Sequence, residues 1–313
     1  MESIEEKRAR LLELAKESVA KAYSTSEHAI MQAINTYNEL EKVKNIINER
    51  LTDWYGIYFP ELRISQHAYA VLASNIGTAK KNADYERLAE LSGIDAASLK
   101  QLANSSIGTE PAEEEYKAIK ELAETQLEIE KLQSDLDAYI KKESEKLMPN
   151  LTYLIDYRLA AELLSKAGSL AKLANMPAST IQLLGAEKAL FRHIKFGAKP
   201  PKYGILFKLK EVANSRKEDR GRIARAYAAK ISIAARADAV SKQFIGELLK
   251  KQLDETIQKI KEKPKQAVQH GKGQQWHQKE ERYGMHSHNA RYEGRVSGER
   301  GQGKDKKGAN SNA

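Results

Sequence analysis

Two stripes of apolar residues at helical spacing constrain the fold of this chain more than any other feature. In each, an apolar residue recurs every third or fourth position, which is the pattern of a coiled-coil seam. The first stripe stops at Pro60 and contains Ile30, Ile34, Tyr37, Leu40, Val43, Ile47, Leu51, Trp54 and Tyr58. The second contains Ile119, Leu122, Ile129, Leu132, Leu136 and Ile140. Together they predict a long antiparallel helix pair, whose first helix, at 26–58, spans roughly 50 Å.

Local signals set the expected limits of this pair. Thr109 and Pro111 predict the start of the second long helix. Gln126 falls at an inward position, where it either fixes the register or is a tolerated polar gap. Residues 63–107 contain short helical patterns separated by glycines, and predict a small helical cap.

A change of composition at Met148, Pro149 and Asn150 predicts a domain boundary. Beyond it, helical patterns cover residues 151–173, a short stretch opened by Pro177, and residues 186–194 and 222–253. The expected fold class is all-α. Its parts are an N-terminal helix at 1–24, a coiled-coil domain at 25–147, a helical domain at 148–258 and a disordered basic tail at 259–313.

The helix at 186–194 carries cations on one side. Lys188, Arg192 and Lys195 follow one another at steps of four and three residues, and therefore face one direction. A loop stiffened by two prolines adds Lys199 and Lys202. This pattern fits a polyanion such as a phosphate backbone, although a stripe of Lys and Arg is also typical of a solvated helix face.

The start of this helix is a second candidate contact. Gly185 is placed to end one helix and begin the next, which leaves the N–H groups of Ala186 and Glu187 available to an anion. Glu187 acts against this, because a carboxylate in the first turn satisfies the same dipole and repels phosphate.

The distribution of charge favours nucleic-acid binding. Residues 185–236 hold 14 Lys and Arg against 4 Asp and Glu, while the whole chain carries a net charge of only +9. Such concentration is expected of a nucleic-acid footprint. Arg222, Arg225 and Arg236 fall on one side of the predicted helix at 222–253 and form a second cationic stripe. Salt bridges to Glu218, Asp219 or Asp238 explain these arginines equally well.

Several classes of function find no support in the residues. The chain has no cysteine, which excludes disulfides, thiolate metal sites and cysteine nucleophiles. It shows no glycine-rich phosphate loop and no nucleophile motif, so we expect no cofactor and no catalytic residue. His277, His286 and His288 in the tail lack accompanying acidic ligands, so we expect no metal site. No apolar run reaches membrane-spanning length, and we expect an intracellular, cytoplasmic protein.

Three segments resemble the Nop family of archaeal and nucleolar proteins. Residues 176–192, MPASTIQLLGAEKALFR, and residues 221–239, GRIARAYAAKISIAARADA, are similar to two of its characteristic blocks. Residues 48–62, NERLTDWYGIYFPEL, resemble the end of its first coiled-coil helix. The resemblance spans about residues 25–257 and identifies the domain at 148–258 as a Nop domain.

The resemblance implies a scaffold without catalysis of its own. In this family the Nop domain binds a kink-turn RNA already occupied by a small ribosomal-type protein, and the coiled coil mediates self-association into a homodimer. Archaeal members organise box C/D particles in which fibrillarin methylates ribose 2′-hydroxyls. Carried over by motif, the element that contacts RNA and partner consists of Gly185, Ala186, Glu187, Lys188, Ala189, Leu190, Phe191 and Arg192. Phe191 is expected in the core or at the partner.

This sequence departs from the fuller archaeal pattern at its N-terminus. Those members carry an α/β domain that holds fibrillarin, whereas here about 25 residues, helical in pattern, precede the first stripe. The fibrillarin contact is therefore left open. Two alternatives also remain: a spliceosomal-type assembly factor, and a nucleic-acid-binding coiled-coil protein that needs no partner and uses its tail, including Trp276, Tyr283 and Tyr292.

Overall fold

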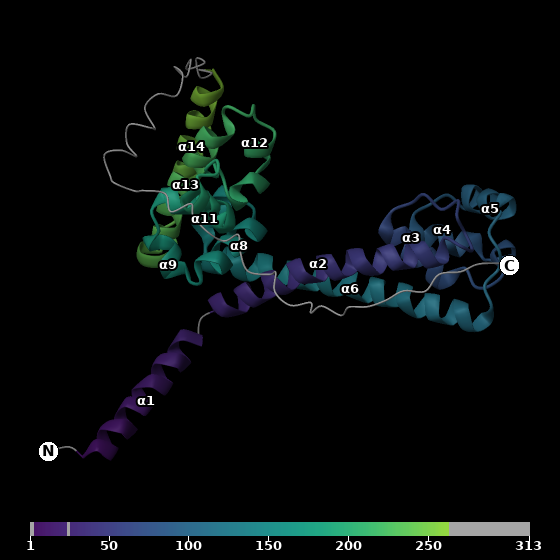
Figure 1. Ribbon diagram of the computed structural model, residues 1–313, viewed down its shortest axis with the longest axis horizontal. Helices are drawn as coiled ribbons and strands as arrows, with labels where there is room; N and C mark the ends of the chain where they lie inside the picture. The colour runs from purple at the N-terminus through teal and green to yellow at the C-terminus, as the bar shows by residue number, and fades with distance from the viewer. Residues whose placement is uncertain (1–2, 24–25, 263–313) are drawn as a thin grey trace, which may run out of the picture. The chain divides into compact units, whose positions relative to one another are not determined.

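The computed structural model describes residues 3–23 and 26–262, and every regular element within them is helical (Figure 1). The expected all-α class is confirmed. The α-helices are α1 (Ile4–Tyr23), α2 (Ser26–Tyr55), α3 (Gln66–Asn75), α4 (Tyr85–Ser92), α5 (Ala96–Ser105), α6 (Glu113–Leu147), α7 (Pro149–Leu154), α8 (Tyr157–Ala167), α9 (Leu170–Asn175), α10 (Ala178–Leu183), α11 (Glu187–Phe196), α12 (Lys210–Ala213), α13 (Arg220–Arg236) and α14 (Gly246–Glu262).

Helices α2 and α6 form the predicted antiparallel pair (Figure 1). The direction follows from two contacts: the Tyr58 hydroxyl, past the end of α2, donates to Glu115 near the start of α6, whereas Gln133 further along α6 donates to Glu41 in α2. The Glu115 carboxylate also accepts the N–H of Ala112. This cap shows that α6 begins after Ala112, so the start predicted at Thr109 and Pro111 was wrong by one turn.

The inward face of α6 is more polar than the apolar stripe predicted. Its buried residues are Ile119, Ala123, Gln126, Gln133, Ile140 and Ser144, which follow one another at steps of four, three, seven, seven and four residues. Three predicted seam residues point outward: Val43, Trp54 and Leu132 are 43%, 39% and 47% exposed. The prediction for these three was wrong because both faces of each helix carry apolar residues, and spacing alone does not identify the inner one.

Gln126 is fully buried and lies in the seam, as its inward position predicted. Its Nε2 donates to the carbonyl of Gln66, at the start of α3, at 3.2 Å, while its Oε1 has no partner. This bond links α6 to the start of α3 and does not bear on the register between α2 and α6, which stays a prediction.

Helices α3, α4 and α5 form the predicted cap over one end of the pair, and Lys80 is buried beneath them. Its ammonium group donates to the carbonyls of Tyr58 and Gly108, both at 2.6 Å, and to the Ser106 hydroxyl at 2.9 Å. The short helix η1 (Lys80–Asn82) carries this lysine. Burial of the ammonium lowers its pKa, but three acceptors satisfy its three protons.

Helices α7 to α10 and α12 to α14, together with the start of α2 and the end of α6, enclose a core to which α8 and α13 contribute most. The single helix predicted at 151–173 is instead divided into α7, α8 and α9, because Asp156 and Ser169 cap new helices with their side chains. The helix predicted at 222–253 is also broken: α13 passes into a π-helical turn, η3 (Ala237–Ser241), and Lys242 takes a left-handed conformation with φ 52° before α14.

The buried carboxylate of Asp238 explains that break. It accepts hydrogen bonds from the N–H groups of Asn150 and Leu151 at 3.0 Å and from the Asn150 side chain at 2.8 Å, and so caps α7. Asn150 in turn bonds to the backbone of Gln243 and Ile245. The π-helical turn therefore places one carboxylate where it ties the start of α7 to the segment that leads into α14.

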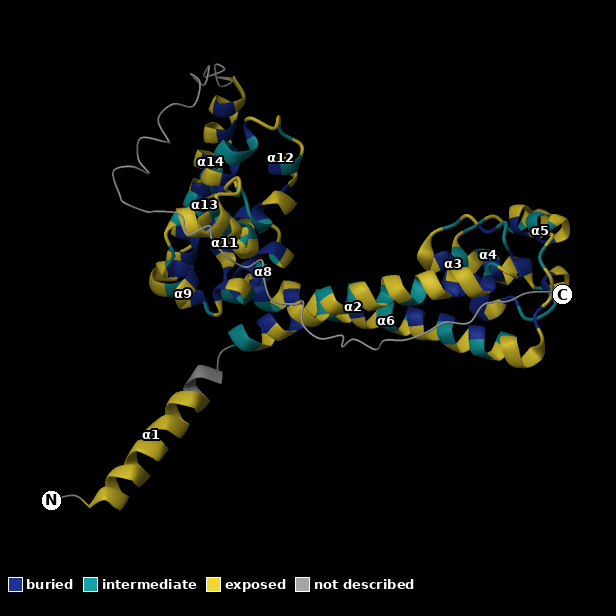
Figure 2. Ribbon diagram, in the orientation of Figure 1, coloured by how far each residue is buried: buried dark blue, intermediate teal, exposed yellow. Residues whose placement is uncertain are grey.

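Helix α1 forms as predicted at Ile4–Tyr23, and residues 3–20 are all exposed (Figure 2). Of the described helices, none is long and apolar enough to cross a membrane. The tail expected at 259–313 begins within α14, which continues to Glu262. The rest of that tail, with its histidines and aromatic residues, lies outside the described residues.

Candidate nucleic-acid interface

Residues 185–204 leave the helical core and return to it at nearly the same place. The N–H of Gly204 donates to the carbonyl of Gln182, and the N–H of Ile205 donates to the carbonyl of Leu184, both at 2.8 Å. The Gln182 side chain also donates to the carbonyl of Lys202 at 2.6 Å. These bonds close the base of the segment, which we call the excursion.

Glycine is required at both ends of the excursion. Gly185 has φ +84°, and a Cβ there would lie 2.2 Å from Cγ2 of Ile205. A Cβ on Gly204 would lie 1.9 Å from the carbonyl oxygen of Leu184. The two glycines therefore allow the first and last residues of the excursion to pack against each other, and this contact fixes where α11 begins and where the loop after it returns.

Helix α11, the central element of the excursion, has no buried residue. Lys188, Arg192 and Lys195 are all exposed, and in the described part of the chain no side-chain ion pair or hydrogen bond engages Lys188 or Arg192. Ala189 and Leu190 are half-buried on the side nearer the core. The structure thus places the predicted cations on a helix that presents them to solvent.

Apolar residues are exposed on the same helix. Phe191, Ile194 and Phe196 are 60%, 73% and 68% exposed. Of the two places expected for Phe191, the core is excluded, and contact with a partner stays a prediction. The ammonium of Lys195 lies 5.8 Å from the Phe191 ring centre and 5.3 Å from that of Phe196. A helix that exposes both aromatic rings and cations has the composition of a docking surface rather than of a solvated face.

The backbone N–H groups that lead into α11 are hydrogen-bonded within the chain. The N–H of Gly185 donates to the Glu187 carboxylate at 2.6 Å, and the N–H of Ala186 donates to the carbonyl of Leu183 at 2.9 Å. The expectation that the Ala186 N–H is open to an anion was therefore wrong. Burial raises the pKa of Glu187, but N–H groups of Gly185 and Glu187 outweigh it and keep that pKa below its usual value. The carboxylate stays charged in the first turn of α11, where a negative charge suits the helix dipole.

The three arginines of α13 differ in what they contact. Arg222 pairs with the buried carboxylate of Asp219 at 3.2 Å, as the salt-bridge interpretation predicted. Arg236 is exposed, and its Nε donates to the carbonyl of Ala174 at 3.0 Å. Arg225 is exposed, and no hydrogen bond or ion pair of its side chain occurs among the described residues. Of the predicted stripe, Arg225 is the residue most available to an external phosphate.

The loop that follows α11 keeps its cations exposed as well. Lys199 and Lys202 are both exposed, and Lys202 lies next to Gly221 at the start of α13. Just beyond, the rings of Tyr203 and Phe207 are stacked, a feature that the sequence analysis did not identify. The sequence does show two aromatic residues four positions apart beside lysines. That their rings stack could not be predicted, because the stacking depends on how the excursion closes.

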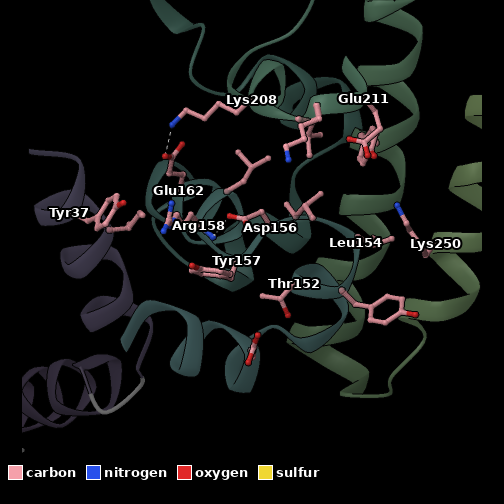
Figure 3. Close-up of a pocket in the computed structure, with 18 of the residues that line it drawn as sticks. Tyr37, Thr152, Leu154, Asp156, Tyr157, Arg158, Glu162, Lys208, Glu211 and Lys250 are labelled. Atoms are coloured by element: carbon pink, nitrogen blue, oxygen red, sulfur yellow. Dashed lines mark hydrogen bonds and ion pairs between the residues drawn. The ribbon is translucent and has the colours of Figure 1, made fainter. Parts of the chain in front are cut away.

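A cleft of about 740 Å³ lies where α2 and α6 meet α7 and α8 (Figure 3). Arg158 donates to Asp137 at 2.5 Å and lies over the rings of Tyr37 and Tyr157, at 5.2 and 5.7 Å from their centres. Lys208 pairs with Glu162, which lies one turn further along α8 than Arg158. These paired charges join helices rather than forming an acid–base couple, and in the described residues no group of three His, Asp or Glu side chains is placed to hold a metal ion.

Comparison with known proteins gives a consistent result. The family model Nop, described as a snoRNA binding domain, fibrillarin, matches residues 36–259. An uncharacterised NOP5 family protein of Methanocaldococcus jannaschii is 37% identical over 254 residues, which are 80% of this chain and 61% of that protein. Nucleolar protein 58 of Schizosaccharomyces pombe is 39% identical over 215 residues, 68% of this chain and 42% of that protein.

A third relative, nucleolar protein 56 of Dictyostelium discoideum, is 40% identical over 224 residues, 69% of this chain and 41% of its own length. The chain thus spans less than two thirds of each of these relatives. One solved structure, a fibrillarin/NOP5p complex, is similar with a TM-score of 0.47 and 22% identity, over 80% of this chain and 76% of its own. That likeness is too low to carry an argument about partners.

Proposed function

Because the chain belongs to the Nop family, we propose that it is a noncatalytic scaffold of a box C/D guide ribonucleoprotein. In this proposal it binds kink-turn RNA together with a small ribosomal-type protein and supports ribose 2′-O-methylation of ribosomal or transfer RNA. The description of the matching family names snoRNA binding and fibrillarin, and this supports RNA and fibrillarin as partners. The methyl transfer belongs to fibrillarin and not to this chain.

The observation that carries the proposal is the exposure of α11. Its cations are suited to phosphate, while its aromatic residues are suited to an apolar protein surface. Both sets are exposed, and the contacts of Lys195 with the Phe191 and Phe196 rings stay within the helix itself. A surface that carries both cations and exposed apolar rings fits a complex of RNA and protein better than it fits RNA alone or protein alone. The Glu187 carboxylate accepts the N–H of Gly185, so its charge is engaged within the excursion and on the side of Gly185.

Charge reversal on α11 tests this function. We expect the double variant K188E with R192E to weaken binding to a preformed complex of kink-turn RNA and ribosomal-type protein by about 1–3 kcal/mol for each charged interaction removed, with the fold intact. An electrophoretic mobility shift measures this effect. The control variant, K131E with K142E, reverses two exposed lysines on α6 and should bind as the wild type does. Equal binding by the α11 variant would exclude the assignment.

We also propose self-association through the α2–α6 pair. Its outer surface exposes Val43, Ile46 and Trp54 on α2 and Leu132 and Tyr139 on α6. On α2 these follow helical spacing, as a second stripe opposite the inner seam would. A second copy of the chain is the partner that the family resemblance suggests for this surface.

Two other interpretations of the same features can be separated from this proposal by experiment. A partner-independent nucleic-acid binder would bind single- and double-stranded RNA without regard to the kink-turn. A spliceosomal-type assembly factor would share the composite binding but would join a particle without guide RNA or methylation. The archaeal relative favours the box C/D assignment, with the cytoplasm as the expected location.

A further inference from the structure

We propose that Tyr203, Phe207 and Arg220 form a stacking site for one unpaired nucleobase of the bound RNA. The site lies at the closed base of the excursion and at the start of α13. It rests on the proposed RNA-binding function, and adds a contact that reads an exposed base rather than the phosphate backbone.

Two of the three side chains are stacked, and the third lies close to one of their rings. The rings of Tyr203 and Phe207 are nearly parallel, with an interplanar angle of 15° and centres 5.0 Å apart. The guanidinium carbon of Arg220 lies 5.5 Å from the centre of the Phe207 ring. Because stacked planes touch at about 3.5–4 Å, the wider separation of the ring centres means that the rings are displaced sideways. Part of the ring face of Phe207 therefore stays open, and the residue is 41% exposed.

Neighbouring residues fix the positions of Phe207 and Arg220. Phe207 lies in the short helix η2 (Ile205–Lys208), between Leu206, which is fully buried, and Leu209, which is 8% exposed. Arg220 is fixed by a hydrogen bond from its Nε to the carbonyl of Ser215 at 3.0 Å. An aromatic ring that is held at the surface by buried neighbours contributes less to folding than a buried one, and is available to a flat ligand.

The surroundings favour a nucleobase as that ligand. Lys202 is exposed and precedes Tyr203 directly, which supplies a cation for the phosphate of the same nucleotide. Proteins recognise unpaired RNA bases by stacking them on aromatic rings and on the plane of an arginine, and both types of surface are present here. A base within a duplex is already stacked on its neighbours, so the site selects a base that is unpaired.

The test uses kink-turn RNAs that each carry 2-aminopurine at one unpaired position, bound together with the small ribosomal-type protein. For one position, binding to the wild-type chain should quench the 2-aminopurine fluorescence, and F207L should abolish the quenching. We expect F207L to weaken RNA binding about 5- to 150-fold, which corresponds to the loss of one stacked base. The control is Y153L, which removes another half-exposed aromatic ring, in α7, and should leave the quenching unchanged.

A second measurement needs no further protein variant. An RNA with an abasic nucleotide at the quenched position should bind the wild-type chain as weakly as intact RNA binds F207L, and F207L should bind both RNAs equally. If wild type and F207L bind intact and abasic RNA equally well while K188E with R192E fails to bind, the stacking site is excluded and the proposed function stands. If F207L instead loses only the protein partner, the ring is a protein contact and the inference is wrong. Absence of any RNA binding by the wild type would exclude both proposals.

Discussion

At the scale of the residue, Gly185 is the position on which the exposed placement of α11 depends most. It combines a left-handed backbone with a contact that leaves no room for a Cβ against Ile205. Most glycines with positive φ meet only the first of these two demands. The close contact with Ile205 links the conformation of Gly185 to the closure of the whole excursion.

We therefore expect G185A to destabilise the chain by about 2–4 kcal/mol, the sum of backbone strain and overpacking. Gly197, at the end of α11, offers a matched control, because its φ is +66° but nothing lies within 4 Å of the added Cβ. G197A should cost only about 1 kcal/mol. Chemical denaturation of both variants measures the difference, and equal losses would show that the contact with Ile205 does not matter.

Asp137 gives stability a dependence on pH. The hydrogen bond from Arg158, aided by that from Tyr157, lowers the pKa of Asp137 despite its partial burial. A depressed pKa in the folded state means that the stabilisation is present above the pKa of the unfolded chain, about 3.9, and is lost as pH falls through the folded value. D137N should therefore be less stable than wild type at pH 7, and the gap should close below about pH 4. Thermal unfolding at the two pH values tests this, and a constant gap would contradict it.

At the scale of the element, the coiled coil shows what periodicity predicts and what it leaves open. The existence, direction and approximate limits of α2 and α6 were predictable, because two long stripes in one chain have few other uses. The inner face of α6 was not, since Gln126 and Gln133 occupy it while Leu132 points outward. Gln133 donates to Glu41, a partner that is distant in sequence, and no local pattern shows this pair.

The same limit applies to the second half of the chain. Lys188, Arg192 and Lys195 were predicted on one face from spacing alone, and all three are exposed. The pair of Arg222 with Asp219 is local and follows from spacing, whereas the bond of Arg236 to Ala174 depends on how α13 packs. The break at Asp238 depends on Asn150 in α7. Local periodicity predicts a helix, but its limits also depend on caps, and the start of α7 is capped by Asp238, which is distant in sequence.

The outer stripe of α2 leads to a prediction about assembly. I46E places a carboxylate within that stripe and should weaken self-association at least about tenfold, because it would bury an unpaired charge in the interface. K42E adds a carboxylate at another exposed position of α2 and is the control. Sedimentation velocity over a range of concentrations measures both. Identical behaviour of the two variants would mean that the stripe does not mediate association.

At the scale of the whole molecule, a structured composite site is distinct from a general attraction to RNA. The described residues present α11 and Arg225, while residues 263–313 add 11 Lys and Arg against 5 Asp and Glu. Such a segment attracts phosphate without recognising its shape. The two contributions should respond differently to salt.

Removal of residues 263–313 should therefore reduce the slope of log affinity against log salt concentration, by about 0.7–0.9 for each phosphate that the chain no longer neutralises. Preference for the complex of kink-turn RNA and ribosomal-type protein over a straight duplex should persist, since it depends on α11. Filter binding at several salt concentrations measures both quantities. Loss of the preference together with the tail would place recognition outside α11.

The central claim is that this chain recognises RNA and a protein as one surface. An electrophoretic mobility shift of kink-turn RNA, titrated with this chain in the presence and in the absence of the small ribosomal-type protein, tests it most directly. We predict tight addition to the preformed complex, and far weaker binding to the RNA alone or to the protein alone. Equal affinity for the RNA with and without the protein would contradict the claim.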